Sequence, residues 1–330
     1  MNPGQPLNID RTMIPASTFR SRTGAIALAL LALLPFAPAR AAHRVFEPAE
    51  IVNAEARYPE GPQLLADGSL LSAEMPMNRI VRSRPEGTET VWHDRGCGPT
   101  SVKRLPAGGF WVLCHLGHRV MRLSPDFETI AEITMADDGS RVTWPNDASV
   151  DSGGNLFLSS SGLFSLQAPA TGRLIRIDAA SNKAHVLAAG IHYSNGVLVQ
   201  EALHRVLVSA HLDGRVLAFP LEAPDRVGPA AVFFDFRDAP APAHPYDLGG
   251  PDGIAAFADG EVLVANYGNG RLILLSPEGK FEAVVPVALP YVTNMAISPD
   301  QKSLYVTMTR DNESSRLDGL VQRFAIRTEE

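Results

Sequence analysis

The sequence predicts an all-β fold, a six-bladed β-propeller with a central channel. After residue 43, no window of roughly 10–18 residues places its apolar side chains with a helical period. Instead, short apolar strands separated by Gly, Asp and polar turns recur in six copies along the chain. A repeat of roughly 40–50 residues with about four strands in each unit is typical of propeller blades.

The six copies align on one position at the start of their first strand. Segments such as "GPQLLADGSLLSAE" and "PDGIAAFADGEVLVANYGNG" share an order of turn, strand, Asp-Gly turn and strand. In a propeller, the start of each inner strand and the loop after each second strand lie on one face, so the aligned positions should ring one mouth of the channel. The aligned positions, separated by 40, 46, 49, 57 and 42 residues, are Glu60, Thr100, Asn146, Asn195, Asp252 and Asn294.

Two further segments have predicted places in this ring. Residues 43–58 precede the first copy, and we expect part of them to add an outer strand to the last blade, which closes the ring and removes exposed sheet edges. The Pro- and Ala-rich stretch 235–250 lengthens the gap between the fourth and fifth copies. We expect it to form an ordered loop over one face rather than a domain boundary.

The first 41 residues are typical of a secretory signal peptide. Arg20 and Arg22 precede an apolar run at 23–39, and "ARA" at 39–41 is an A-x-A cleavage site. We therefore expect residues 1–41 to be removed and residues 42–330 to form a single propeller domain. The mature chain should be periplasmic or secreted, without stable insertion in a membrane. An uncleaved membrane anchor is the alternative.

Composition argues against nucleic acid as a partner and does not decide whether the two cysteines form a disulfide. The net charge of −7 and the lack of a basic cluster argue against binding to nucleic acid. The two cysteines, Cys97 and Cys114, are too few for a zinc-finger type of site. An oxidising compartment permits a disulfide between them, and two buried thiols are the alternative.

Four of the six aligned positions carry strong oxygen donors: Glu60, Asn146, Asn195 and Asp252. Two carboxylates and two amide carbonyls make an oxygen-only site for one divalent cation, with Ca²⁺ preferred and Mg²⁺, Mn²⁺ or Zn²⁺ as alternatives. Asn and Asp are also common turn residues, but a Glu at the same phase of the repeat favours a metal site. Asn294 is a candidate fifth donor or substrate contact.

A resemblance supports this interpretation. "YPEGPQ", "WPNDASVDSGGNLF", "YSNGVLV" and the fifth copy resemble the gluconolactonase/regucalcin (senescence marker protein) family over residues 57 to 325. The resemblance implies a six-bladed propeller, one divalent metal and lactonase activity, with a related branch that hydrolyses phosphotriesters. It implies Glu60, Asn195 and Asp252 as ligands, with Asn146 bound directly or through water, and Asp252 as the general base or water-orienting group.

The sequence differs from the sugar-lactone members of that family at two places. Trp144 stands two residues before the third-copy Asn, where those members carry an Arg that binds hydroxyls. "LSSSG" at 158–162 replaces an acidic motif. Both differences make the predicted mouth less polar, so we expect Trp144 to contact an apolar or aromatic lactone.

The predicted reaction is metal-assisted hydrolysis of a cyclic ester. His115 and His211, at the ends of second strands, are candidate substrate contacts and proton shuttles with a pKa near neutral, or rim residues bonded to a neighbouring blade. No "GxSxG" signature for a nucleophilic serine is present. A hydrolase of phosphotriesters or other esters, and a non-catalytic binding propeller, are the alternatives.

Overall fold

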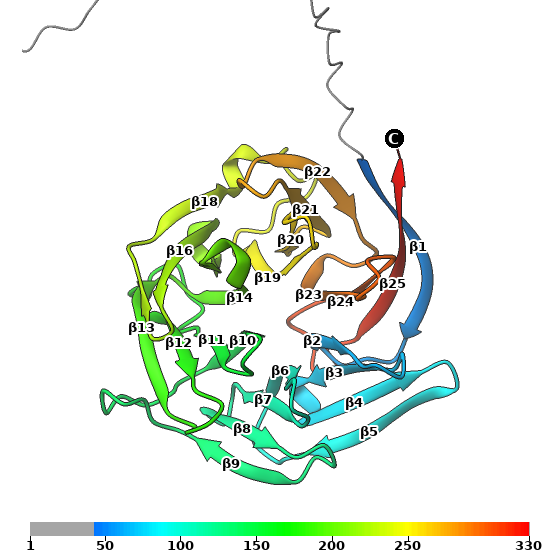
Figure 1. Ribbon diagram of the computed structural model, residues 1–330. Helices are drawn as coiled ribbons and strands as arrows, with labels where there is room; N and C mark the ends of the chain where they lie inside the picture. The colour runs from blue at the N-terminus through cyan, green and yellow to red at the C-terminus, as the bar shows by residue number, and fades with distance from the viewer. Residues whose placement is uncertain (1–42, 330) are drawn as a thin grey trace, which may run out of the picture. The chain divides into compact units, whose positions relative to one another are not determined.

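The computed structural model describes residues 43–329, which form six small antiparallel sheets arranged in a ring (Figure 1). The six-bladed propeller predicted from the repeats is confirmed. Blade one contains β2 (Pro59–Leu64), β3 (Leu70–Glu74), β4 (Arg79–Arg84) and β5 (Gly87–His93). Blade two contains β6 (Pro99–Arg104), β7 (Phe110–Cys114), β8 (Arg119–Leu123) and β9 (Thr129–Ile133). Blade three contains β10 (Pro145–Val150), β11 (Leu156–Ser160), β12 (Gly172–Ile177) and β13 (Ala184–Ile191).

The second half of the ring has the same plan with one addition. Blade four contains β14 (Ser194–Gln200), β15 (Arg205–Ala210), β16 (Arg215–Ala223) and β18 (Ala231–Asp235), and the short β17 (Arg226–Val227) also pairs with β16. Blade five contains β19 (Gly250–Ala256), β20 (Val262–Tyr267), β21 (Arg271–Leu275) and β22 (Phe281–Pro286). Blade six contains β23 (Tyr291–Ile297), β24 (Ser303–Thr309) and β25 (Gly319–Glu329), with β1 (His43–Asn53) outermost.

The ring closes through its two ends. β1 pairs antiparallel with β25 along its whole length, from His43 opposite Glu329 to Asn53 opposite Val321. The N-terminal strand therefore becomes the outer strand of the last blade, as the sequence predicted (Figure 1). This arrangement pairs the edge of β25, which would otherwise be open to another chain.

The apolar core of the described residues lies between the blades. Each pair of neighbouring blades shares one cluster of buried apolar side chains, because each twisted sheet packs its faces against the next. Trp111, Phe157 and Phe324 are among the largest fully buried side chains. Burying each contributes roughly 1.5–3 kcal/mol. The Trp111 indole N–H donates to the Gly154 carbonyl of the next blade at 3.1 Å.

A disulfide closes the start of blade two. Cys97, just before β6, is bonded to Cys114 at the end of β7, and both are fully buried. The structure thus contains the bond that the sequence left open. It lies beside the first strand of the blade, next to Thr100 and His115.

The loop at 235–250 packs against blade five. It contains the 3₁₀ turn η4 (Phe236–Asp238), and the Pro240 carbonyl accepts a bond from Arg271 at 2.6 Å. Near its end, the Tyr246 ring lies 5.4 Å from Tyr291 and 6.4 Å from Tyr267. The segment lies within one compact unit together with the six blades, and its place over one face stays a prediction.

The remaining helical turns of residues 43–329 are short. They are η1 (Met75–Met77), η2 (Glu201–Leu203) and η3 (His211–Asp213). Residues 43–329 contain no helix with the length and hydropathy that a membrane crossing requires. The predicted signal peptide, residues 1–41, lies outside the described residues.

Candidate metal centre and substrate cavity

A cavity of about 240 Å³ opens on the face where the inner strands begin. Side chains from all six blades line it, although they are far apart in the sequence. The structure therefore brings most of the predicted site together. The predicted residues in the lining are Glu60, Thr100, His115, Asn146, Asn195, His211 and Asp252.

Each of the four oxygen donors sits at a break in strand pairing. Glu60 is the second residue of β2, and its pairing with β3 shifts register between Glu60 and Gln63. The same shift occurs at the start of the other five inner strands. Because a β-bulge bends the strand and re-aims a side chain, this repeated irregularity turns one residue of each inner strand away from the regular alternation.

Strained aromatic residues precede three of the donors. Tyr58, Trp144 and Tyr193 each lie two residues before a donor and have φ angles of 43°, 44° and 58°. This left-handed conformation costs a bulky residue on the order of 1–3 kcal/mol and clusters at functional sites. The turn that it makes fixes how the chain enters the inner strand.

Glycines follow three of the donors, Gly61, Gly196 and Gly253, because the next blade is too close for a side chain. A Cβ added at Gly196 would lie 2.1 Å from the backbone oxygen of Asp252 in blade five. A Cβ at Gly253 would lie 2.4 Å from Cγ of Asn294 in blade six. Tight backbone contact therefore fixes the inner strands, and with them the donors, relative to one another.

The two carboxylates repel each other in a dry environment. Glu60 is 8% exposed and Asp252 is 4% exposed. Burial raises the pKa of both carboxyls well above their usual range, and the charge of Asp252 raises the pKa of Glu60 further. A bound cation would favour the ionised form of both side chains.

The donor set fits a hard divalent cation. The Asn195 side-chain oxygen is buried without a hydrogen-bond partner, which costs about 1–3 kcal/mol unless a ligand occupies it. Within residues 43–329, no three His, Cys, Asp or Glu side chains are grouped so that they could hold a metal. Cation binding in this cavity would therefore depend on the amides of Asn146 and Asn195 as well as on the carboxylates, the chemistry that Ca²⁺ accepts.

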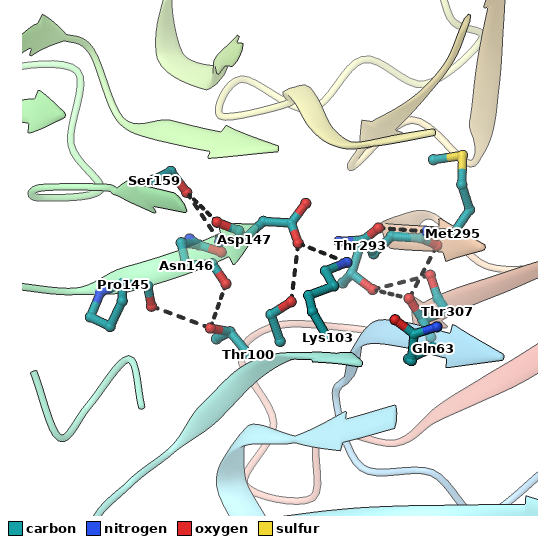
Figure 2. A network of polar contacts seen from close by, with 12 residues as sticks. Gln63, Thr100, Lys103, Pro145, Asn146, Asp147, Ser159, Thr293, Met295 and Thr307 are labelled. Carbon is teal, nitrogen blue, oxygen red and sulfur yellow. Dashed lines mark hydrogen bonds and ion pairs between the residues drawn. The ribbon is translucent and has the colours of Figure 1, made fainter. Parts of the chain in front are cut away.

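A third carboxylate lies beside the donors with its own counter-charge. Asp147 is 3% exposed, and its Oδ1 lies 3.4 Å from the Lys103 ammonium and accepts a bond from Ser101 Oγ at 3.2 Å. Figure 2 shows Lys103 reaching Asp147 from the neighbouring blade. Asp147 raises the pKa of Glu60 and Lys103 lowers it. The Lys103 ammonium therefore balances part of the negative charge that Asp147 adds beside the donors.

The two remaining aligned positions support the donors instead of joining them. The Thr100 hydroxyl donates to the Asn146 backbone carbonyl at 2.7 Å (Figure 2). Asn294 lies against Gly253, its Oδ1 accepts the Met295 N–H at 2.8 Å, and it is not among the residues that line the cavity. The structure thus does not bring Asn294, predicted as a substrate contact, into the cavity.

The histidines line the cavity, but not as shuttles with a near-neutral pKa. Burial lowers the pKa of His115 and of His211 to about 4, and backbone carbonyls only partly offset this effect. His211 faces Pro251 O at 3.0 Å and Leu248 O at 2.9 Å, so both ring nitrogens meet blade five or its preceding loop. The prediction of a near-neutral pKa is therefore wrong, and the alternative of rim residues bonded to the next blade describes the contacts.

Trp144 lies beside the cavity rather than in its lining. The centroids of its ring and the His118 ring lie 5.0 Å apart, edge to face. The Trp144 backbone N–H donates to His118 Nδ1 at 3.0 Å. The residue therefore shapes the turn before Asn146. The structure provides no contact that would support its predicted role in substrate binding.

The cavity also has an aromatic wall that was not predicted from the sequence. This wall consists of Phe164, Tyr193 and Tyr267, which line the cavity. Their ring centroids lie 5.4, 5.8 and 5.7 Å from that of His211. The Tyr58 hydroxyl bonds that of Tyr267 at 2.8 Å. A Tyr two residues before a donor was a readable signal for Tyr58 and Tyr193. Tyr267 ends the second strand of blade five, the place in the repeat from which His115 and His211 were predicted, whereas Phe164 comes from a loop that the repeat does not mark.

The family of the chain is shown by a family model. The model for the SMP-30/Gluconolactonase/LRE-like region matches residues 58–310. The chain belongs to this family. This match covers all four donors and the whole cavity lining except Asn312 and Leu317.

Curated relatives are distant. A 6-deoxy-6-sulfogluconolactonase from Pseudomonas putida is 26% identical over 63% of this chain and 68% of its own length. Strictosidine synthase-like protein 13 from Arabidopsis thaliana is 20% identical over 60% of this chain and 49% of its own length. The family and the first relative support lactone hydrolysis as the class of reaction.

Solved structures share the fold. A gluconolactonase from Xanthomonas campestris has a TM-score of 0.68 and 15% identity, with 88% of this chain and 99% of that chain covered. Regucalcin from Agrobacterium tumefaciens, described as calcium-binding, has a TM-score of 0.67 and 17% identity, with 86% and 95% covered. At these identities the likeness shows the six-bladed fold alone.

Proposed function

We propose that this protein hydrolyses lactones with a divalent cation, preferably Ca²⁺, held by Glu60, Asn146, Asn195 and Asp252. The observation that carries the proposal is the convergence of these donors on one cavity, where the Asn195 oxygen is buried without a partner. The family match and the gluconolactonase-type relative support the choice of a lactone.

The bound cation would polarise the lactone carbonyl and lower the pKa of a water molecule. Asp252 would orient the attacking water and accept its proton, because its carboxylate lines the cavity and is held by the Gly253 N–H. Neither His115 nor His211 is needed as a proton carrier in this scheme.

The paired tyrosines can bind the substrate. Burial raises the pKa of Tyr58 and Tyr267, so both keep their protons at neutral pH. Only one hydroxyl of the pair can donate to the other across their 2.8 Å contact. The second O–H is therefore free to donate to an oxygen of the lactone.

The test combines binding and turnover. Purified protein stripped with a chelator is titrated with Ca²⁺ by calorimetry, and hydrolysis of a lactone panel is followed with a pH indicator before and after Ca²⁺ is restored. We expect one binding site, turnover only with the cation, and loss of both in Asp252→Asn. Lactone hydrolysis at full rate in chelator would contradict the metal role. Turnover of a phosphotriester but of no lactone would contradict the substrate class.

We also propose that the chain is exported. The Cys97–Cys114 disulfide supports this, because such bonds persist in oxidising compartments. Fractionation of the producing cells, followed by N-terminal sequencing of the mature chain, tests it. A start at Ala42 in the periplasm or medium is expected, and a reduced, full-length cytoplasmic chain would contradict export.

A further inference from the structure

Three loops on the face of the cavity carry exposed apolar side chains, which together we call the apolar rim. We use this name for Met77, Leu116, Leu163, Phe164 and Leu166, all more than a third exposed. They lie in the loops after the second strands of blades one, two and three, on the face that carries the cavity. Exposed apolar side chains gathered beside a binding cavity are typical of a ligand-contacting surface.

Phe164 belongs both to the apolar rim and to the lining of the cavity. This side chain lines the cavity and is also 38% exposed. Its ring meets the edge of Tyr193 at 4.8 Å inside the cavity, and Leu163 and Leu166 are its neighbours along the loop. An apolar path therefore leads from the aromatic wall to the surface of blade three.

The loop that carries this path is anchored. The Ser165 carbonyl faces His192 Nε2 at 3.2 Å and accepts the Ala168 N–H at 3.1 Å. The other nitrogen of His192 lies 3.2 Å from Asp213 on η3. These bonds tie the loop of blade three to blade four, so its exposed leucines are held beside the cavity.

Charge in the cavity selects against anionic substrates. Glu60 and Asp252 line it, and among the described residues no Lys or Arg does. A sulfonate or carboxylate on the substrate would meet two carboxylates and no counter-charge except the cation. The substrate in the name of the Pseudomonas relative therefore does not suit this cavity.

We infer that the substrate is a neutral lactone with an apolar chain, whose ring binds at the oxygen donors and whose chain passes Phe164 onto Leu163 and Leu166. This inference rests on the proposed lactonase function and specifies its substrate class. A sugar lactone would place hydroxyls against the aromatic wall and would leave the apolar rim unused.

A homologous series tests the inference. We measure kcat and KM for γ-butyrolactone, γ-hexalactone, γ-nonalactone and γ-undecalactone, with δ-gluconolactone and 6-deoxy-6-sulfogluconolactone as polar and anionic comparisons. We expect kcat/KM to rise with chain length, mainly through KM, by up to about fourfold per buried methylene. Equal kcat/KM across the γ-lactones, or preference for either sugar lactone, would overturn the inference while leaving a lactonase.

A matched pair of variants locates the effect. Leu163→Ser combined with Leu166→Ser should lower the ratio of kcat/KM for γ-undecalactone to that for γ-butyrolactone by about tenfold or more. Leu203→Ser is the control, because Leu203 is as exposed as Leu166, at 47% and 48%, but lies on η2 between the first and second strands of blade four. An unchanged ratio of the two kcat/KM values in the double variant would contradict binding of the chain along Leu163 and Leu166.

Two further measurements separate the remaining outcomes. Calorimetry measures the affinity of Asp252→Asn protein for γ-undecalactone without turnover. The apolar path can therefore be tested even if the proposed lactonase function is wrong. The double variant is also assayed for sedimentation with vesicles of phosphatidylglycerol and phosphatidylethanolamine. Loss of vesicle binding with no change in γ-undecalactone affinity would identify a membrane-facing rim and overturn the inference.

Discussion

Blades one, three, four and five differ from blades two and six at one position of the repeat. In the first group the donor residue at the start of the inner strand lines the cavity. In the second group, Thr100 also lines the cavity but its hydroxyl donates to the Asn146 carbonyl, whereas Asn294 does not line it and its Oδ1 accepts the Met295 N–H. The position in the repeat sets where a side chain begins, but its hydrogen-bond partners decide whether its oxygen remains available to a ligand.

The two groups of blades also depend on each other. Thr100 in blade two bonds the strand that carries Asn146 in blade three. Asn294 in blade six packs on Gly253, the residue after Asp252 in blade five. The supporting residues thus hold the backbone of a donor in the adjacent blade, which is how a site of precise geometry can be assembled from six separate sheets.

Removing a donor should have the largest effect. Glu60→Gln keeps the shape of the side chain but removes one of two charges, so we expect Ca²⁺ affinity to fall by more than about 100-fold, beyond the 10–100-fold cost of changing an outer partner. Calorimetry measures the affinity, and Glu86→Gln on the exposed turn before β5 is the control. Equal affinity in Glu60→Gln and wild type would remove blade one from the donor group.

The thermal stability of the same variant without metal gives a second test. Because Glu60 and Asp252 repel each other, Glu60→Gln without cation should unfold at the same temperature as wild type or higher. A large loss of thermal stability would instead assign Glu60 a structural role and weaken the contrast between the two groups.

The next largest effect should come from breaking the ion pair between Lys103 and Asp147 beside the donors. Lys103→Met leaves Asp147 buried without its cation, so we expect a loss of about 2 kcal/mol in the free energy of unfolding, less than for a fully buried pair because the Lys103 side chain is 16% exposed. Urea denaturation measures it. The double variant Lys103→Met/Asp147→Asn should recover most of the loss. If it does not, the ion pair is not the cause.

The sequence predicted the contrast only in part, and the reasons are physical. Repeat phase predicted that Glu60, Asn146, Asn195 and Asp252 meet at one mouth, because six similar units in a closed ring must place equivalent positions on one face, and all four line the cavity. It could not separate Asn294 from Asn195, since that distinction depends on a contact with Gly253 in another blade. Phe164 was missed because it belongs to a loop, and loops do not keep the phase of the repeat.

Loss of a supporting bond should have a smaller effect than loss of a charge. Thr100→Val removes the 2.7 Å bond to the Asn146 carbonyl, so we expect about 1 kcal/mol less stability and a loss of Ca²⁺ affinity of about tenfold. Thr100→Ser keeps the hydroxyl and should restore both. Thermal unfolding and calorimetry on the two variants make the comparison, and equal losses in both would show that side-chain packing, not the bond, matters.

The smallest effect on the cation should come from Asn294, and this makes it the strictest test of the two groups. Asn294 and Asn195 are the same residue type at the same phase of the repeat, yet only the Asn195 oxygen is buried without a partner beside the cavity. Asn195→Ala should therefore weaken Ca²⁺ binding by at least about tenfold, whereas Asn294→Ala should change it by less than about threefold and lose roughly 1 kcal/mol of stability with its bond to Met295. Calorimetry of both variants decides the matter. If the two losses of affinity were equal, Asn294 would belong with the donors, and hydrogen-bond partners would not be what separates the two groups of blades.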